Sequence, residues 1–427
     1  MKKNNITLAL AAALTFGVST SATAAGFQLA EYSATGLGRA FAGEAAMADN
    51  ASAQFRNPAM LSYLEGTQVS TGAIYVDPNV DVKGELSLGQ MKIPTEAKDI
   101  AKSAVIPNFY LSHQINDQLF VGLAFSTNYG METELGDEFL ATQFGSEAKV
   151  HSIEINPNLA YKINEQFSVG AGVRYVMGEG HFGAVTPTDI KKGPMTIPKG
   201  TNLKYMEGKD SAWGWQLGAA WQINDSNRVG FNYRSAVDLN LEGHAEGLSF
   251  NPMNPEQHFD GSMELSLPAT AELASFHQLT DKVAVHASIN WTDWSSFEKL
   301  EADIPSLSND KVLIKQENWK DNYRFAVGST YQLNQAVVLR TGVAYDMAAV
   351  DDENRTQTIP ETDRIWLSLG AGYQVTKDFN LDAGFTYIFA KDASMTESEP
   401  GHADLGQFTG ETTGNVWLLG VQASYRF

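Results

Sequence analysis

Basic side chains in the second half of the chain are placed where they could bind a carboxylate. Tyr323 and Phe325 alternate with Arg324 in a segment of strand-like periodicity, so Lys320 and Arg324 should share the face opposite the aromatic rings. Arg364 has the same relation to the apolar residues that follow it. Guanidinium and ammonium groups form charge-assisted hydrogen bonds with carboxylates. The alternative is that these cations pair with aspartates and glutamates of the protein itself.

The sequence lacks the motifs of several other site chemistries. It contains no cysteine, which excludes disulfides, thiolate metal sites and cysteine nucleophiles. No G-x-S-x-G setting accompanies the histidines, and no G-x-x-x-x-G-K-[ST] run could hold a nucleotide phosphate. We therefore expect a protein that is not an enzyme and that carries no cofactor or metal.

The chain is strongly acidic, with a net charge of −20 and a pI near 4.8, so nucleic acid is not an expected partner. Much of the acid lies in polar connections, for example at 132–138, 351–353 and 397–399. We interpret these as solvated loops that contact the divalent-bridged lipopolysaccharide of a cell surface, and a specific cation site is the alternative.

Period-2 hydrophobicity is the main structural signal. In 379–389 the odd positions are apolar or aromatic and the even positions are mostly polar or small, and 283–291 and 364–373 divide in the same way. Mean hydropathy is −0.23, which leaves no apolar run of about 20 residues for a membrane-spanning helix. Such alternation is typical of strands with one face toward lipid and one toward a polar interior.

The connections between these segments alternate between short and long. Short turns occur at 116–117, 164–165, 224–227, 280–281, 334–335 and 376–377. Long polar connections, which we expect to be irregular loops, occur at 85–103, 131–149, 179–210, 242–260, 293–318, 347–360 and 391–413. These connections predict an all-β fold, a 14-stranded antiparallel transmembrane β-barrel with both ends on the short-turn, periplasmic side. A soluble β-sandwich would not require this alternation.

The two ends of the chain carry export signals. Residues 1–24 have a basic start, an apolar run and an A-x-A site, which predict a signal peptide. The last strand ends at Phe427, and a terminal aromatic residue resembles the signal that the barrel assembly machinery reads in bacterial outer-membrane proteins. We therefore expect a protein of the outer membrane of a Gram-negative bacterium, with the barrel formed by 67–427.

Residues 25–66 match no barrel strand. They are rich in alanine and glycine and end in Asn57-Pro58-Ala59, which predicts short helices closed by an Asn-Pro turn. Because they precede a barrel and lack its periodicity, we expect them to form a small N-terminal hatch that plugs the lumen.

Several motifs together resemble the FadL family of outer-membrane long-chain fatty-acid transporters. The resemblance covers the whole mature chain and is most specific in the hatch. The matching residues are 26–29, 36–40, Arg56 to Ala59, 75–78, Thr127 to Gly130, Trp319 to Asp321, Tyr323-Arg324 and Asp363-Arg364.

The resemblance implies a monomer that passively takes up long-chain fatty acids. A ligand would enter at a low-affinity outer groove, move to an inner pocket near Phe27 and Leu29, and leave sideways through a kink in the third strand. The kink is formed by Asn128, Tyr129 and Gly130. Because the side-chain period of a strand is two, deletion of Asn128 and Tyr129 should preserve parity while removing the kink.

Alternative functions differ in ligand or in class. Family members that import aromatic hydrocarbons would share the hatch and the kink. A general diffusion porin would share the barrel but would lack a plug of about 40 residues. Lys320 lies in a matching motif and favours an acidic ligand, for which Arg324 and Arg364 are further candidates. The apolar wall of the pocket is not assigned.

Overall fold

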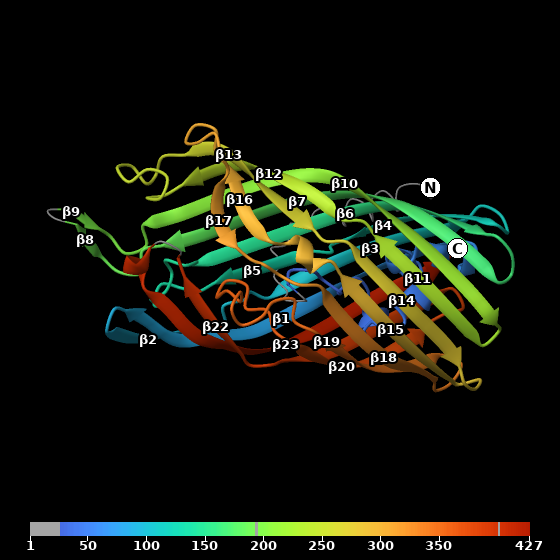
Figure 1. The fold of residues 1–427 in the computed structure, drawn as a ribbon. Helices are drawn as coiled ribbons and strands as arrows, with labels where there is room; N and C mark the ends of the chain where they lie inside the picture. The colour runs from blue at the N-terminus through green and yellow to red at the C-terminus, as the bar shows by residue number, and fades with distance from the viewer. Residues whose placement is uncertain (1–25, 193–194, 400–401) are drawn as a thin grey trace, which may run out of the picture.

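A computed structural model describes residues 26–192, 195–399 and 402–427, so the expected signal peptide lies outside the described residues. These residues form a closed antiparallel β-barrel of 14 strands (Figure 1). Several barrel strands consist of two successive segments, and a small hairpin, β8 (Ile190–Lys192) and β9 (Met195–Ile197), stands apart. No helix among the described residues is long and apolar enough to cross a membrane.

Seven of the 14 barrel strands are single segments, and each of the other seven consists of two successive segments. The first seven are β1 (Thr67–Leu88), β2 (Met91–Ala97) with β3 (Ala104–Gln114), β4 (Leu119–Ser126) with β5 (Gly130–Glu134), β6 (Glu147–Lys162), β7 (Phe167–Val185), β10 (Asn202–Asn224), and β11 (Asn227–Arg234) with β12 (Val237–Glu246). The last seven are β13 (Phe259–Leu267) with β14 (Thr270–Gln278), β15 (Val283–Thr292) with β16 (Lys299–Asp303), β17 (Val312–Gln316) with β18 (Asn322–Gln332), β19 (Val337–Asp346), β20 (Arg364–Gln374), β21 (Phe379–Ala390) with β22 (Ala393–Ser398), and β23 (Gln407–Arg426).

The first and last strands close the barrel. β1 pairs with β23 in unbroken antiparallel register from Gln68 opposite Arg426 to Ser87 opposite Gln407. Side chains alternate as the sequence predicts: Trp366 is fully buried on the inside, whereas Ile365 and Leu367 are exposed on the outer face. An apolar exterior and a filled interior are the arrangement that a bilayer requires of a barrel.

The long connections contain more strand than the sequence predicted. Much of the expected loop at 179–210 belongs to β7 and β10, which pair as far as Val185 opposite Asn202. The expected loop at 85–103 begins with a tight hairpin turned at Gly89, which has a φ of 63°. The reason is that neighbouring antiparallel strands can continue their ladder beyond the apolar band, with polar side chains on both faces.

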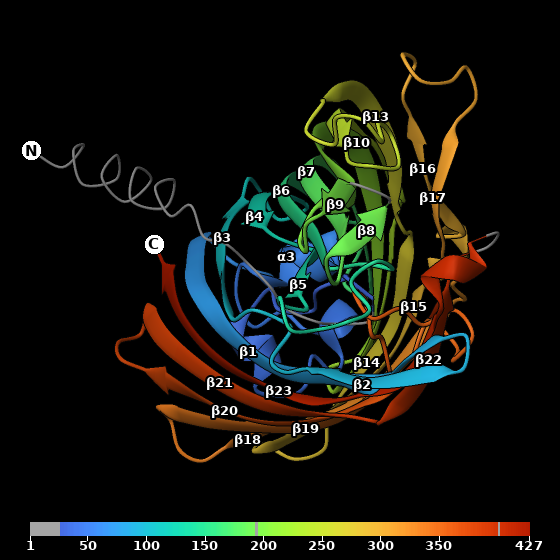
Figure 2. The ribbon, with the colours of Figure 1, turned by 90° about the vertical axis from the view of Figure 1, so that its left-hand side faces the viewer.

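Residues 26–66 lie inside the barrel, where Figure 2 shows them within the ring of strands. They form α2 (Ala34–Leu37), η1 (Glu44–Ala46), α3 (Ala53–Arg56) and η2 (Pro58–Tyr63). The Asn-Pro turn is as predicted: Asn57 caps η2, and its side-chain oxygen accepts a hydrogen bond of 3.0 Å from the Ala59 N–H. The wall opposite is glycine-rich, and an added Cβ on Gly170 would lie 2.5 Å from the Ala59 nitrogen.

Candidate functional site

The third barrel strand is interrupted between Ser126 and Gly130. Ser126 pairs with Glu154 of β6, and Gly130 pairs with His151. The third strand therefore advances four residues while its partner advances three, which defines a β-bulge with one extra residue. Inward positions consequently change from even numbers before the bulge to odd numbers after it. A deletion of two residues would leave this mismatch in place, so the expectation that it would remove the kink is wrong.

The bulge borders a window in the barrel wall. Below the window, β3 and β4 pair up to Phe109 opposite Phe125. Above it, the wall closes again through a bridge between Ala101 and Thr133. Between these two points, the Lys102 N–H donates to the Glu132 carbonyl at 3.4 Å next to the bridge, and no other pairing joins the second and third strands among the described residues. β3 remains paired with β1 on its other side. Pro107 lies on this edge and has no backbone N–H to leave unpaired.

Residues 27–29 pair with the interrupted strand from inside the barrel. The Gly130 N–H donates to the Phe27 carbonyl at 2.8 Å, and the Leu29 N–H donates to the Asn128 carbonyl at 2.6 Å. Gln28 and Tyr129 form an antiparallel bridge between these two bonds. The structure therefore brings together the pocket residues and the kink residues that the sequence singled out separately.

Phe27 lies among four other aromatic rings, and we call these five residues the aromatic cluster. Its ring centroid is 4.7 Å from that of Trp294, 5.6 Å from Phe297, 6.1 Å from Tyr129 and 6.2 Å from Trp319. All five side chains are buried. The 3-10 helix η3 (Trp294–Ser296) supplies Trp294, and the cluster continues into a larger apolar core contributed by β12, β13, β16 and β17.

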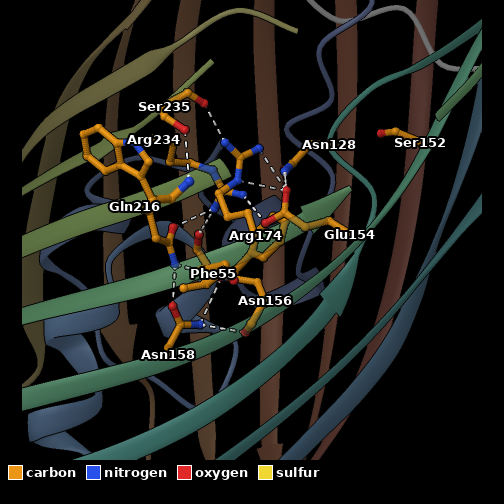
Figure 3. Close-up of polar contacts among 12 residues, drawn as sticks. Phe55, Asn128, Ser152, Glu154, Asn156, Asn158, Arg174, Gln216, Arg234 and Ser235 are labelled. Carbon is orange, nitrogen blue, oxygen red and sulfur yellow. Dashed lines mark hydrogen bonds and ion pairs between the residues drawn. The ribbon is translucent and has the colours of Figure 1, made fainter. Parts of the chain in front are cut away.

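A buried ion network ties the kink to the hatch (Figure 3). Glu154 accepts hydrogen bonds from Arg174 at 2.9 Å, from Arg234 at 2.5 Å and from the Asn128 side chain at 2.5 Å. Arg234 also donates to the Phe55 carbonyl of α3 at 2.5 Å. A carboxylate with two guanidinium partners is stable at this depth because its neighbours compensate its lost hydration.

Comparisons with known proteins identify the family. A family model described as outer membrane protein transport protein (OMPP1/FadL/TodX) matches residues 15–427. The chain belongs to this family. It is similar to the long-chain fatty acid transport protein of Escherichia coli O6:H1, with 34% identity over 449 residues and 98% of each chain covered. The chain is therefore a β-barrel protein of the outer membrane of a Gram-negative bacterium.

Two solved structures share the fold of this FadL-family barrel. One is a FadL homologue of Pseudomonas aeruginosa, with a TM-score of 0.83, 24% identity, and coverage of 94% of this chain and 100% of that one. The other is the toluene transporter TbuX of Ralstonia pickettii, with a TM-score of 0.67, 17% identity, and the same coverage. The fold is therefore shared with a FadL homologue and with a toluene transporter.

The three expected carboxylate ligands of this FadL-family barrel occupy different environments. Lys320 is exposed and precedes β18, which begins only at Asn322. Strand parity therefore does not reach it, and its orientation toward the lumen stays a prediction. Arg364 is buried in ion pairs with Asp346 at 3.2 Å and Glu361 at 3.3 Å. Self-pairing, the alternative weighed from the sequence, thus holds for Arg364.

Arg324 differs from the paired arginines of this FadL-family barrel. Its guanidinium lies 4.7 Å from the ring centroid of Trp366 and donates to the Ala40 carbonyl at 2.7 Å. With Arg56 it lines a cavity of about 40 Å³ beside Leu29. The Nε atoms of both arginines are buried and have no hydrogen-bond partner among the described residues. Sequence reasoning missed Arg56 in this role, although it stands next to the Asn57-Pro58-Ala59 motif.

The remaining hatch candidates are structural. The Asn57 side chain donates to the Ala45 carbonyl at 2.6 Å and to the Ala219 carbonyl of β10 at 3.0 Å, so it joins the hatch to the wall. Pro58 and Ala59 are buried against that wall. Trp294 and Phe297 were missed because they lie in a connection that carries no periodic signal.

Proposed function

We propose that the protein passively takes up long-chain fatty acids and releases them sideways into the outer membrane. The observation that carries this proposal is the window between the second and third barrel strands, which lies beside the buried aromatic cluster. A 16-carbon chain gains roughly 0.8 kcal/mol for each methylene that leaves water, or about 12 kcal/mol in all. A route lined by apolar protein and ending in lipid therefore favours such a cargo over a water-filled pore.

The proposed route has three stages. The apolar core above the aromatic cluster, with residues such as Leu241 and Leu265, supplies the low-affinity outer groove. The aromatic cluster and the adjoining cavities form the inner pocket. For the ligand to pass, residues 27–29 must separate from 128–130, which breaks two backbone hydrogen bonds at a cost of about 1 kcal/mol each. The ligand then leaves through the window without crossing the hatch, which acts as a plug.

We propose Arg324 and Arg56 as the partners of the ligand carboxylate inside the barrel. Both line the same cavity, and each keeps a buried N–H that has no partner among the described residues. Lys320, which has no carboxylate oxygen within 4.0 Å in the described part of the chain, would meet the acid earlier, at the exposed mouth beside Trp319. Arg364 is the weaker candidate because its guanidinium is already paired.

Aromatic hydrocarbons are the second candidate cargo. The aromatic cluster favours them because rings pack well against rings, and it requires no charged group on the ligand. A diffusion porin is the weaker alternative, because the buried hatch fills the lumen that such a pore would need. We further propose that the barrel is a monomer, inserted by the barrel assembly machinery and surrounded by lipopolysaccharide.

Uptake by whole cells tests this proposal. Cells that lack other importers and express the protein should take up labelled oleate, and lipid that co-purifies with the detergent-extracted barrel should be fatty acid by mass spectrometry. Uptake of labelled toluene without uptake of oleate would select the aromatic cargo. Uptake of a small hydrophilic sugar at the same rate as oleate would contradict both.

A further inference from the structure

Two histidines and a glutamate lie together on the outside of the barrel at its extracellular rim. His244 and Glu246 are two residues apart on β12, with buried Ala245 between them, so both side chains lie on the outer face. Ala245 pairs with Phe259 of β13, and the next step of this register places His258 opposite Glu246. One ligand atom from each of His244, Glu246 and His258 lies within 4.8 Å of the others.

The geometry of these three side chains is close to that of a metal site. His258 Nε2 is 2.8 Å from Glu246 Oε2, and the imidazole rings of His244 and His258 stack with centroids 4.2 Å apart. Neutral imidazole is the form that binds a metal ion.

Neighbouring strands orient the carboxylate. The Asn202 side chain donates to Glu246 Oε1 at 2.7 Å, which leaves Oε2 directed at His258. Glu207 of β10 lies 3.6 Å from His244 Nδ1, and the Tyr205 hydroxyl donates to Glu207 at 2.9 Å. Such second partners fix ligand orientation in metal sites. The carboxylate of Glu207 is also within reach of the site.

We propose that His244, Glu246 and His258 bind a Zn²⁺ ion, with a fourth position open to water or to Glu207. Two imidazoles and one carboxylate are a common ligand set for this ion, whereas Mg²⁺ and Ca²⁺ prefer oxygen alone. The site is accessible from water. Tyr205, which pairs with Glu246, marks the position of the site along β10. It is eight residues, or about 26 Å at 3.3 Å per residue, from Trp213, whose ring packs on Tyr175 in the aromatic girdle, so the site lies beyond the girdle.

The ion would join the connection between β12 and β13 to the rim. His258 stands at the end of that connection, and Glu246 and His244 stand at its start. A three-ligand clip across both ends would hold 247–257 in one position. These three residues form no metal-binding motif in the sequence, because only the register of β12 and β13 brings them together.

Zinc titration tests the site. The full-length barrel, purified in detergent at pH 7.5, is titrated with ZnCl₂ by isothermal calorimetry, alone and with millimolar MgCl₂. We expect one Zn²⁺ per chain and little competition from Mg²⁺, which prefers oxygen ligands. His258→Gln and His244→Gln should each weaken binding by roughly tenfold or more, since even second-shell changes cost 10–100-fold.

His113→Gln is the matched control, because it changes an exposed histidine at the periplasmic end of β3. Heat-modifiability on a gel establishes that each variant is folded. The proposal is overturned if the wild-type protein binds no Zn²⁺ at pH 7.5, or if the His258→Gln and His113→Gln variants bind Zn²⁺ equally well. Equal competition by Mg²⁺ would also overturn it, since that would mean a non-specific acidic surface.

Discussion

Deletion of Asn128 should close the window and stop transport. The third strand has two residues, Thr127 and Asn128, opposite Ile153 alone, while Tyr129 already bonds to Ser152 at 2.9 Å. With Asn128 removed, the register Ser126 to Glu154 would continue unbroken to Gly130 and His151. The strand would straighten, and its edge would pair with β3 in place of residues 27–29.

The cost to stability should be small. The deletion removes the hydrogen bonds of Asn128 to Glu154 and to the Leu29 N–H, at about 1–3 kcal/mol together. Against this, β3 and the third strand are separated over eight residue steps on each edge, from Phe109 to Ala101 and from Phe125 to Thr133, or about 26 Å. Along this length, among the residues that the structure describes, the edge of the third strand is paired only with residues 27–29 and, next to the bridge, with Lys102. Pairing even part of that edge recovers several backbone hydrogen bonds.

The assay is uptake of labelled oleate in cells that lack other importers, normalised to the amount of heat-modifiable barrel. We expect uptake to fall to background while oleate still binds to the purified protein. Asn128→Ala is the control, since it loses the same side chain but keeps the bulge, and it should retain most of the uptake. Normal uptake by the deletion variant, together with a crystal structure showing an unbroken third strand, would refute lateral exit.

Three further predictions concern buried charges. Changing Arg324 and Arg56 together to Gln should weaken oleate binding by about 1.5–3 kcal/mol, measured by calorimetry, without affecting toluene. Unchanged oleate affinity would place the carboxylate elsewhere. Glu154→Ala should cost about 3–5 kcal/mol in the free energy of unfolding by urea, since it leaves two guanidinium groups buried and unpaired; Glu165→Ala, at an exposed turn, should cost almost nothing. Burial raises the pKa of Glu317 to about 7, above the 4.5 expected when unfolded, so its segment is most stable below pH 4.5 and loses that stability as pH rises through 7. Glu317→Gln should abolish that dependence in tryptophan fluorescence, and a dependence that persists would assign it to another group.

The barrel was predictable because its period is local. Alternation along each segment fixes which side chains face outward, and the order of short and long connections fixes the strand count. The short helices of the hatch were predictable from the Asn-Pro turn in the same way. Strand lengths were not, since the polar ends of β7 and β10 read as loop when taken one at a time and become a ladder only when paired.

The candidate site was predictable only in part. Asn128 and Phe27 were found through motif resemblance, and the structure pairs the two segments that contain them, 128–130 and 27–29. Glu154 gave no signal, because its importance comes from Arg174 and Arg234 on other strands. The parity argument for Lys320 does not hold, because it was extended two residues past the start of β18. Contacts that depend on cross-strand register cannot be read from a single segment.

The bridge between Ala101 and Thr133 means that strand pairing bounds the opening on all sides. If the opening continued to the extracellular rim, the second and third strands would be able to separate there, and each passage of a ligand would disturb the pairing that closes the barrel. An opening bounded by pairing separates the requirement for ligand passage from the requirement for a closed barrel. The residues that border the opening can differ with the shape of the ligand. The pairing of β1 with β23, and the pairing above and below the opening, keep the barrel closed. Substitutions along this opening should therefore leave the pairing that closes the barrel unchanged.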